Sequence, residues 1–206
     1  LGDIPAHWEV LPLRRITTRV ATGRTPPSTN TNYFSDGTIE WFTPGDFASG
    51  IEIDRSNRKI TPEAVEDGVC SIFPKGTVFL VGIGATLGKV AVGTAPGSAN
   101  QQINAIISAE NTDPYFLAYF LHGFRTEVRV TSNGNTLGIL NQEGTKSLPI
   151  PVPPHAEQVA IAADLHDHDN QEAEVVQQIE RSTGLLQEYR SALITAAVTG
   201  QLSELQ

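Results

Sequence analysis

The sequence predicts an α+β fold, in which a globular domain over residues 1–150 precedes a long helical region over residues 151–206. The segment 148–154 holds four prolines, which can neither continue a helix nor donate to a central sheet ladder. No further proline follows between residues 156 and 198. The first region instead alternates short β-branched runs with turn-forming residues. We therefore expect a mainly antiparallel or mixed sheet followed by a coiled-coil-type helix.

Within the globular region, local signals place most elements. Residues 11–20 fit either a strand or a short helix, and residues 62–69 fit a short helix. Asp113 followed by Pro114 is typical of an N-cap and first helical position, so a helix is predicted through about residue 124. The expected strands are 38–42, 77–81, 89–92 and 103–107. The expected loops are 21–32, 82–88 and 131–138.

The second region carries a heptad seam. Apolar and small residues recur there at alternating spacings of four and three, which is the pattern of paired helices. A lone helix of this length, roughly 65 Å at 1.5 Å per residue, has too little partner surface on a small domain. We therefore expect helix pairing, including a homodimer, and the alternative is that the helix folds back on its own domain. The seam is Val175, Ile179, Ser182, Leu186, Tyr189, Leu193 and Ala196.

Three residues mark the ends and the middle of this helix. Pro154 suits its first turn, where the missing N–H is not needed. Gly184 costs about 1 kcal/mol relative to alanine and permits a bend. Gly200 is typical of a C-terminal cap.

Charge is sorted along the chain. Residues 1–150 hold 12 Lys and Arg against 14 Asp and Glu, whereas residues 151–206 hold 2 against 9. The stretches 10–35 and 68–109 contain basic residues and no acid. They could build a surface that faces phosphates, or they could simply be solvated.

The composition argues against several classes of protein. One cysteine allows no internal disulfide, and five scattered histidines form no metal motif, so we expect no metal and no cofactor. The sequence has no signal peptide and no apolar run that could span a membrane, so a cytoplasmic protein is expected. The chain also lacks methionine, so we expect its natural start to have been trimmed, to be disordered or to have been cut away, and the chain could be part of a longer protein.

Two motifs invite a catalytic interpretation and fail it. Residues 82–90 resemble a phosphate loop, but five residues separate Gly82 from the Gly-Lys pair and Val90 replaces the hydroxyl that would hold Mg²⁺. Residues 111–115 resemble the aromatic motif of amino-methyltransferases with one proline too few. The glycine-rich turn at 82–88, with Thr86 and Lys89, suits contact with a DNA backbone instead.

Seven segments together resemble the DNA-specificity (S) subunits of type I restriction-modification systems. Their order and spacing carry the resemblance, and they cover nearly the whole chain. They include Gly-Arg-Thr-Pro at 23–26, Trp-Phe-Thr-Pro-Gly-Asp at 41–46 and Asn-Gln-Gln-Ile-Asn-Ala at 100–105. The others are 1–10, 84–90, 150–158 and 189–200.

The resemblance implies a target-recognition domain followed by a helix that spaces and pairs recognition units. Family members usually carry two such halves, so this chain is either a half-size subunit or half of a longer one. The implied role is recognition of double-stranded DNA without catalysis. Methyl transfer from S-adenosylmethionine would belong to modification subunits, and ATP-driven cleavage to a restriction subunit. The alternatives are a protein-interaction scaffold that binds no DNA and, less in keeping with the motifs, a hydrolase.

The candidate DNA contacts lie on the polar loops. Arg24 and Lys89 suit phosphates or guanine edges, since both side chains donate to paired acceptors. Amide and hydroxyl groups on the 131–138 loop suit adenine or thymine edges, and these are Ser132, Asn133, Asn135 and Thr136. The lesser candidates are Thr25, Ser28, Thr86 and Gln101. The helix-pairing candidates are Val175, Ile179, Leu186, Tyr189 and Leu193.

Overall fold

The structure is a computed structural model that describes residues 3–47, 50–126 and 138–201. The chain divides into two compact units, Leu1–Ala163 and Asp164–Gln206. The first holds every strand of the described chain and the beginning of the long helix α5 (His155–Val198). The second consists of the rest of that helix and the residues after it. The architecture is α+β with mixed sheets, as the sequence predicts.

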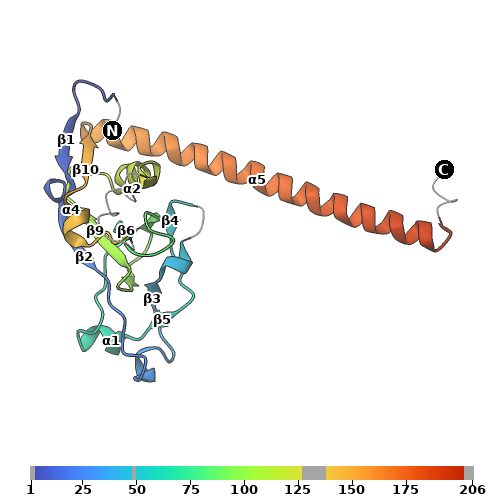
Figure 1. The fold of residues 1–206 in the computed structure, drawn as a ribbon, viewed down its shortest axis with the longest axis horizontal. Helices are drawn as coiled ribbons and strands as arrows, with labels where there is room; N and C mark the ends of the chain where they lie inside the picture. The colour runs from blue at the N-terminus through green and yellow to red at the C-terminus, as the bar shows by residue number, and fades with distance from the viewer. Residues whose placement is uncertain (1–2, 48–49, 127–137, 202–206) are drawn as a thin grey trace. The chain divides into compact units, whose positions relative to one another are not determined.

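A five-stranded sheet forms the centre of the first unit (Figure 1). All its neighbours are antiparallel except the last pair, where β4 runs parallel to β7. The predicted strands 77–81, 89–92 and 103–107 are its three inner strands, and their side chains are almost all buried because both faces are covered. In sheet order the strands are β2 (Thr17–Thr22), β9 (Ile103–Ser108), β6 (Val78–Val81), β7 (Val90–Gly93) and β4 (Glu52–Ile53).

The two faces of this sheet support different layers. Val78 and Leu80 point to one face, where they pack with Leu117 of α2 (Pro114–Gly123). Phe79 and Val81, one residue out of phase, pack with the second layer on the opposite face. That second layer is a small sheet in the order β5 (Lys59–Ile60), β3 (Ile39–Phe42) and β8 (Ser98–Ala99), in which β3 and β8 are parallel.

The proline-rich segment is itself a strand, which the sequence did not predict. β10 (Pro149–Val152) pairs antiparallel with β1 (Glu9–Pro12) in a separate two-stranded sheet. Prolines are tolerated here because each strand has only one neighbour. The outer edge of the strand needs no partner, so N–H groups that are missing there cost no hydrogen bond. Residues 11–20, which fitted a strand or a helix, contain the end of β1, the 3₁₀ turn η1 (Leu13–Arg15) and most of β2.

The predicted start of α2 is confirmed. The side chain of Asp113 accepts a hydrogen bond from the backbone N–H of Phe116 at 2.8 Å, and Pro114 occupies the first helical position. The short helix expected at 62–69 is α1 (Pro62–Glu66). The remaining short elements are η2 (Thr31–Tyr33), η3 (Pro44–Asp46) and α4 (Gln142–Lys146).

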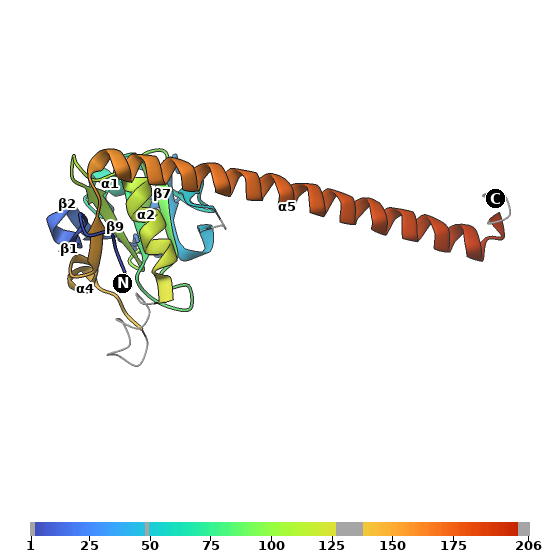
Figure 2. The ribbon, with the colours of Figure 1, turned by 90° about the horizontal axis from the view of Figure 1, so that it is seen from above.

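Side chains from the first turn of α5 fix that turn to the globular unit beside α2 (Figure 2). Gln158 is 1% exposed; its side-chain oxygen accepts from the N–H of Asp113 at 2.9 Å and its nitrogen donates to the carbonyl of Pro153 at 2.9 Å. Glu157 accepts from the indole of Trp8 at 3.1 Å. The buried polar groups of Gln158 need such partners, so these bonds hold the first turn of α5 against the globular unit.

The C-terminal cap predicted for the long helix, Gly200, is confirmed. The helix ends at Val198, and Gly200 takes a positive φ of 78° with its N–H bonded to the carbonyl of Ala197. This is the left-handed conformation that glycine adopts without strain. The helix continues without interruption through Gly184.

Candidate nucleic-acid interface

Three loops meet at the same end of the five-stranded sheet. β2 and β6 finish there, and β7 and β9 begin there, because Thr22 pairs with Asn104, Val81 with Ile103 and Leu80 with Val90. We call this the loop end of the sheet, and define it by the loops 23–30, 82–89 and 99–102. The fold therefore brings together segments that are far apart in the sequence.

Two of these loops are joined at Gly23. Its N–H bonds to the carbonyl of Ile103 at 3.0 Å, and the next N–H, of Arg24, bonds to that of Ala99 at 2.8 Å. A Cβ atom at residue 23 would lie 2.2 Å from the Ala99 oxygen, so only glycine allows this approach. Beyond this junction, the hydroxyl of Thr25 bonds to the side-chain oxygen of Gln101. The structure thus places two of the lesser candidates side by side, both exposed.

Arg24 is held by its backbone while its side chain stays exposed. Its carbonyl accepts from the indole N–H of Trp41 at 3.0 Å and lies 3.4 Å from the sulfur of Cys70. Its guanidinium donates to the carbonyl of Gly68 at 3.2 Å, which occupies one of its five N–H groups. Burial raises the pKa of the Cys70 thiol, so this cysteine is suited to packing and not to reaction. Ser28 lies exposed further along the same loop.

The 82–89 turn has the glycine geometry that its sequence suggests. Gly84 and Gly88 take φ values of 93° and 83°, in the region that residues with a Cβ avoid. Thr86 is half-buried within the turn. Lys89 is also half-buried, and its ammonium donates to the carbonyl of Phe47 at 2.8 Å, which leaves two of its three N–H groups for other acceptors.

Four predicted base-reading residues, Ser132, Asn133, Asn135 and Thr136, lie outside the described residues. The described residues on either side of that gap both contact the 82–89 turn. Arg125 donates to the carbonyl of Leu87 at 3.4 Å, and Ile139 forms a bridge with Ile83. Arg125 is a basic residue beside the loop end that the sequence analysis missed, because nothing local distinguishes it from a solvated arginine.

The structure separates the acid-free stretches of the sequence. Arg14 and Arg15 precede β2 and Lys75 precedes β6, so they start from the end of the sheet opposite the loop end. A strand of six residues spans about 20 Å, too far for one compact surface to include both ends. Of the basic residues in those two stretches, Arg24 and Lys89 remain at the loop end.

The helical seam is largely solvent-exposed. Val175, Ile179, Leu186 and Tyr189 are 54%, 59%, 68% and 63% exposed, and Leu193 is half-buried. Exposed apolar residues in this heptad spacing form the kind of stripe that a second helix covers.

Among the described residues, no group of three or more His, Cys, Asp and Glu side chains is placed to hold a metal ion. Across those same ranges, every helix is too short or too polar to cross a bilayer.

Known proteins resemble this chain across most of its length. A family model described as the type I restriction modification DNA specificity domain matches residues 5–181. The type I restriction enzyme MjaIX specificity subunit of Methanocaldococcus jannaschii is 33% identical over 192 residues, covering 87% of this chain and 43% of that protein. The EcoprrI specificity subunit of Escherichia coli is 27% identical over 158 residues, covering 74% and 38%.

Solved structures share the fold. A chain from a study of complex assembly and conformational transition of the type I R-M system superposes with a TM-score of 0.77 at 21% identity, covering 97% of this chain and 48% of that one. The HsdS subunit from Thermoanaerobacter tengcongensis gives 0.62 at 22% identity, covering 84% and 40%. This chain spans less than half the length of these relatives. The match to the family model over residues 5–181 shows that the chain belongs to the family of type I restriction-modification DNA specificity domains.

Proposed function

We propose that this chain is a sequence-recognition unit that binds one half of a double-stranded DNA target. The observation that carries the proposal is the convergence of three loops with polar and basic side chains at the loop end of the sheet, where Arg24, Thr25 and Gln101 are held together. Hydrogen-bonding side chains on a rigid sheet are suited to reading base edges, and the basic ones to positioning the phosphate backbone. The four untested loop residues, Ser132, Asn133, Asn135 and Thr136, remain candidates for the same surface.

In this proposal the chain is not itself catalytic. The chemistry is supplied by modification subunits that transfer the methyl group and by a restriction subunit. These partners, or a second copy of the chain, would cover the exposed seam of α5. The negative charge of residues 151–206 fits a region that contacts protein, because DNA would be repelled by it. We also propose that residues 1–150 form the DNA-binding part and residues 151–206 the spacing and pairing part, in the cytoplasm.

Arg24→Ala with Arg14→Ala as its control tests the proposal. Both arginines are exposed and both changes remove one positive charge, but only Arg24 lies at the loop end. The chain is assembled with its modification subunits, and duplex binding is measured by fluorescence anisotropy over a range of salt concentrations. We expect Arg24→Ala to weaken binding by about 1–3 kcal/mol and Arg14→Ala to leave it nearly unchanged.

Two results would count against DNA recognition. If the assembly that contains the chain without substitutions binds duplex DNA no better than the modification subunits alone, the chain is a scaffold. If Arg14→Ala weakens binding as much as Arg24→Ala does, the contact is a diffuse charge effect and not a site at the loop end.

A further inference from the structure

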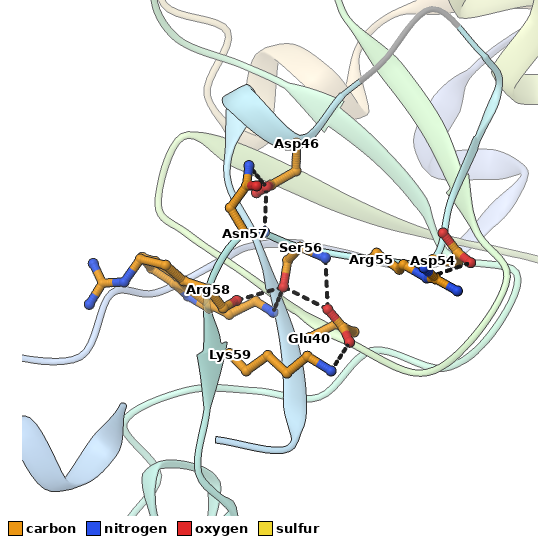
Figure 3. Close-up of polar contacts among 9 residues, drawn as sticks. Glu40, Asp46, Asp54, Arg55, Ser56, Asn57, Arg58 and Lys59 are labelled. Atoms are coloured by element: carbon orange, nitrogen blue, oxygen red, sulfur yellow. Dashed lines mark hydrogen bonds and ion pairs between the residues drawn. The ribbon is translucent and has the colours of Figure 1, made fainter. Parts of the chain in front are cut away.

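The turn between β4 and β5 is held in one conformation by two carboxylates (Figure 3). The first is Asp46. One of its oxygens accepts from the backbone N–H of Asn57 at 2.8 Å and from the side-chain amide of Asn57 at 2.7 Å. Its other oxygen accepts from the N–H of Thr43 at 2.7 Å. Asp46 therefore ties this turn to the residue that follows β3.

The second carboxylate is Glu40, whose side chain is 15% exposed. It accepts from the N–H of Ser56 at 2.7 Å and pairs with the ammonium of Lys59 at 2.6 Å. Burial alone raises the pKa of Glu40, but the bonds from Lys59 and Ser56 outweigh this and lower it below its ordinary value. The carboxylate is thus charged at neutral pH, when it can accept all these bonds.

This turn presents Arg58 in a fixed orientation. The carbonyl of Arg58 accepts from the N–H of Trp41 at 3.3 Å. Its guanidinium carbon lies 4.1 Å from the centre of the Phe34 ring and 5.6 Å from that of Trp41. Stacking holds the flat face of a guanidinium and leaves its N–H edge free to donate. To the residues that the structure describes, this exposed guanidinium makes neither a hydrogen bond nor an ion pair.

Arg58 is adjacent to the loop end. The ring of Trp41 that lies under its guanidinium donates its indole N–H to the carbonyl of Arg24. Two arginines therefore flank one buried tryptophan, one from the 23–30 loop and one from the turn between β4 and β5. Figure 3 shows Arg58 and Arg55 extending to opposite sides of this turn, and the guanidinium of Arg58 is the one that lies against the Phe34 and Trp41 rings.

The charges around Arg58 favour a neutral partner over a phosphate. Residues 36–67 contain eight acids against Arg55, Arg58 and Lys59. Lys59 is paired with Glu40, and Arg55 lies 3.8 Å from Asp54. The carboxylate of Asp46, which binds the neighbouring Asn57, would repel a phosphate, whereas the O6 and N7 acceptors of guanine carry no net charge and match the arginine edge.

We propose that Arg58 reads a guanine in the major groove of the target, with Phe34 acting as the positioning residue that holds its plane. The proposal rests on the proposed function, because it assigns one base-reading residue within that DNA surface. Recognition of guanine by Arg58 requires no movement of the turn between β4 and β5, since Asp46 and Glu40 already hold that turn in place.

The test compares Arg58→Gln with Arg55→Gln, which removes the same charge from the same turn at a side chain that is 89% exposed. Each full-length chain is produced with its modification subunits, and the methylated motif is mapped by sequencing cellular DNA. The chain without substitutions should give a methylated motif that contains guanine. Arg58→Gln should lose roughly 5- to 150-fold of the preference at that one position and keep the rest of the motif. Arg55→Gln should leave every position unchanged.

Phe34→Leu separates stacking from mere proximity. It should relax the same motif position, by less than Arg58→Gln does. An unchanged motif in Arg58→Gln overturns the assignment, and so does a uniform loss of methylation that Arg58→Lys restores, since that marks a phosphate contact. Failure of the unmodified chain to produce any motif is a different result, because it rejects the proposed function itself.

Discussion

The globular unit and the helical unit treat their apolar side chains in opposite ways: the first buries them and the second leaves most of its seam exposed. In the first, the central strands are buried on both faces, and even the polar loops are tied down by glycine junctions and carboxylate-bonded turns. In the second, four of the five pairing candidates are more than half exposed. The comparison teaches that the first unit buries its apolar side chains against one another, whereas the second leaves most of its seam exposed, and we expect another helix to cover that seam.

Breaking the helical seam should have the largest effect. Leu186→Asp would place a charge inside the paired helices, which costs about 3–5 kcal/mol when the charge has no partner. We expect sedimentation to show a smaller species than the unmodified chain forms. Gln187→Asp adds the same charge one residue off the seam and should leave the mass unchanged. If Leu186→Asp keeps the mass as well, the seam does not mediate association.

Removing the side chain that fixes the start of α5 should be the next largest effect. Gln158→Ala leaves the N–H of Asp113 and the carbonyl of Pro153 without their buried partner. The free energy of unfolding of the globular unit should fall by about 1–3 kcal/mol. Gln171→Ala truncates an exposed glutamine of the same helix and should change it by less than 0.5 kcal/mol. Chemical denaturation monitored by Trp8 and Trp41 fluorescence measures both, and equal losses would contradict the account.

Two glycines sharpen the contrast between the units. Gly23→Ala would force a Cβ against the Ala99 carbonyl, so the globular unit should lose about 1–3 kcal/mol. Gly184→Ala meets open space within a helix and should instead gain up to about 1 kcal/mol of helix stability. Thermal melts followed by circular dichroism report both signs. A neutral Gly23→Ala would show that the two loops are not packed as closely as the structure has them.

Removing the lysine of the 82–89 turn should weaken DNA binding modestly and uniformly. Lys89→Ala is expected to lower affinity for all duplex sequences and to reduce the slope of log affinity against log salt by about 1, because one phosphate contact is lost. Lys75→Ala, at the opposite end of the sheet, serves as the control. No change at low salt would remove Lys89 from the set of contacts, and a change confined to one sequence would make it a base reader.

The smallest expected effect is the acid sensitivity of the turn between β4 and β5. The pKa of Glu40 is lowered in the folded protein, so the charged carboxylate stabilises the fold above its unfolded pKa. That contribution is lost as the pH falls through the folded value. Glu40→Gln should therefore be less stable at neutral pH, and the difference should shrink as the solution is acidified. A difference that is constant from neutral to acidic pH would show that the charge plays no part.

Local signals were sufficient to predict the elements whose causes are local. The cap at Asp113, the buried strands on either side of the glycine turn and the cap at Gly200 all follow from a few neighbouring residues. The family resemblance added the division into a recognition part and a spacing part. The sequence predicts Arg24, Thr25 and Gln101 as loop residues, and the fold brings them together.

The remaining features depend on contacts between distant parts of the chain. His7 and Trp8 meet Glu157 about 150 positions away, so no local pattern marks β1 and β10 as partners. In the sequence Arg58 is one of three basic residues in an acidic stretch, and only the fold places the Phe34 ring against its guanidinium. Likewise, Arg14 and Arg24 share one acid-free stretch of the sequence, and only the direction of β2 places them at opposite ends of the sheet.

The most direct test of the account is selection of DNA from a random duplex pool by the chain assembled with its modification subunits, followed by sequencing. The account predicts enrichment of one short sequence that Arg24→Ala weakens and that the modification subunits alone do not select. Enrichment of the same sequence by the modification subunits without this chain would contradict it.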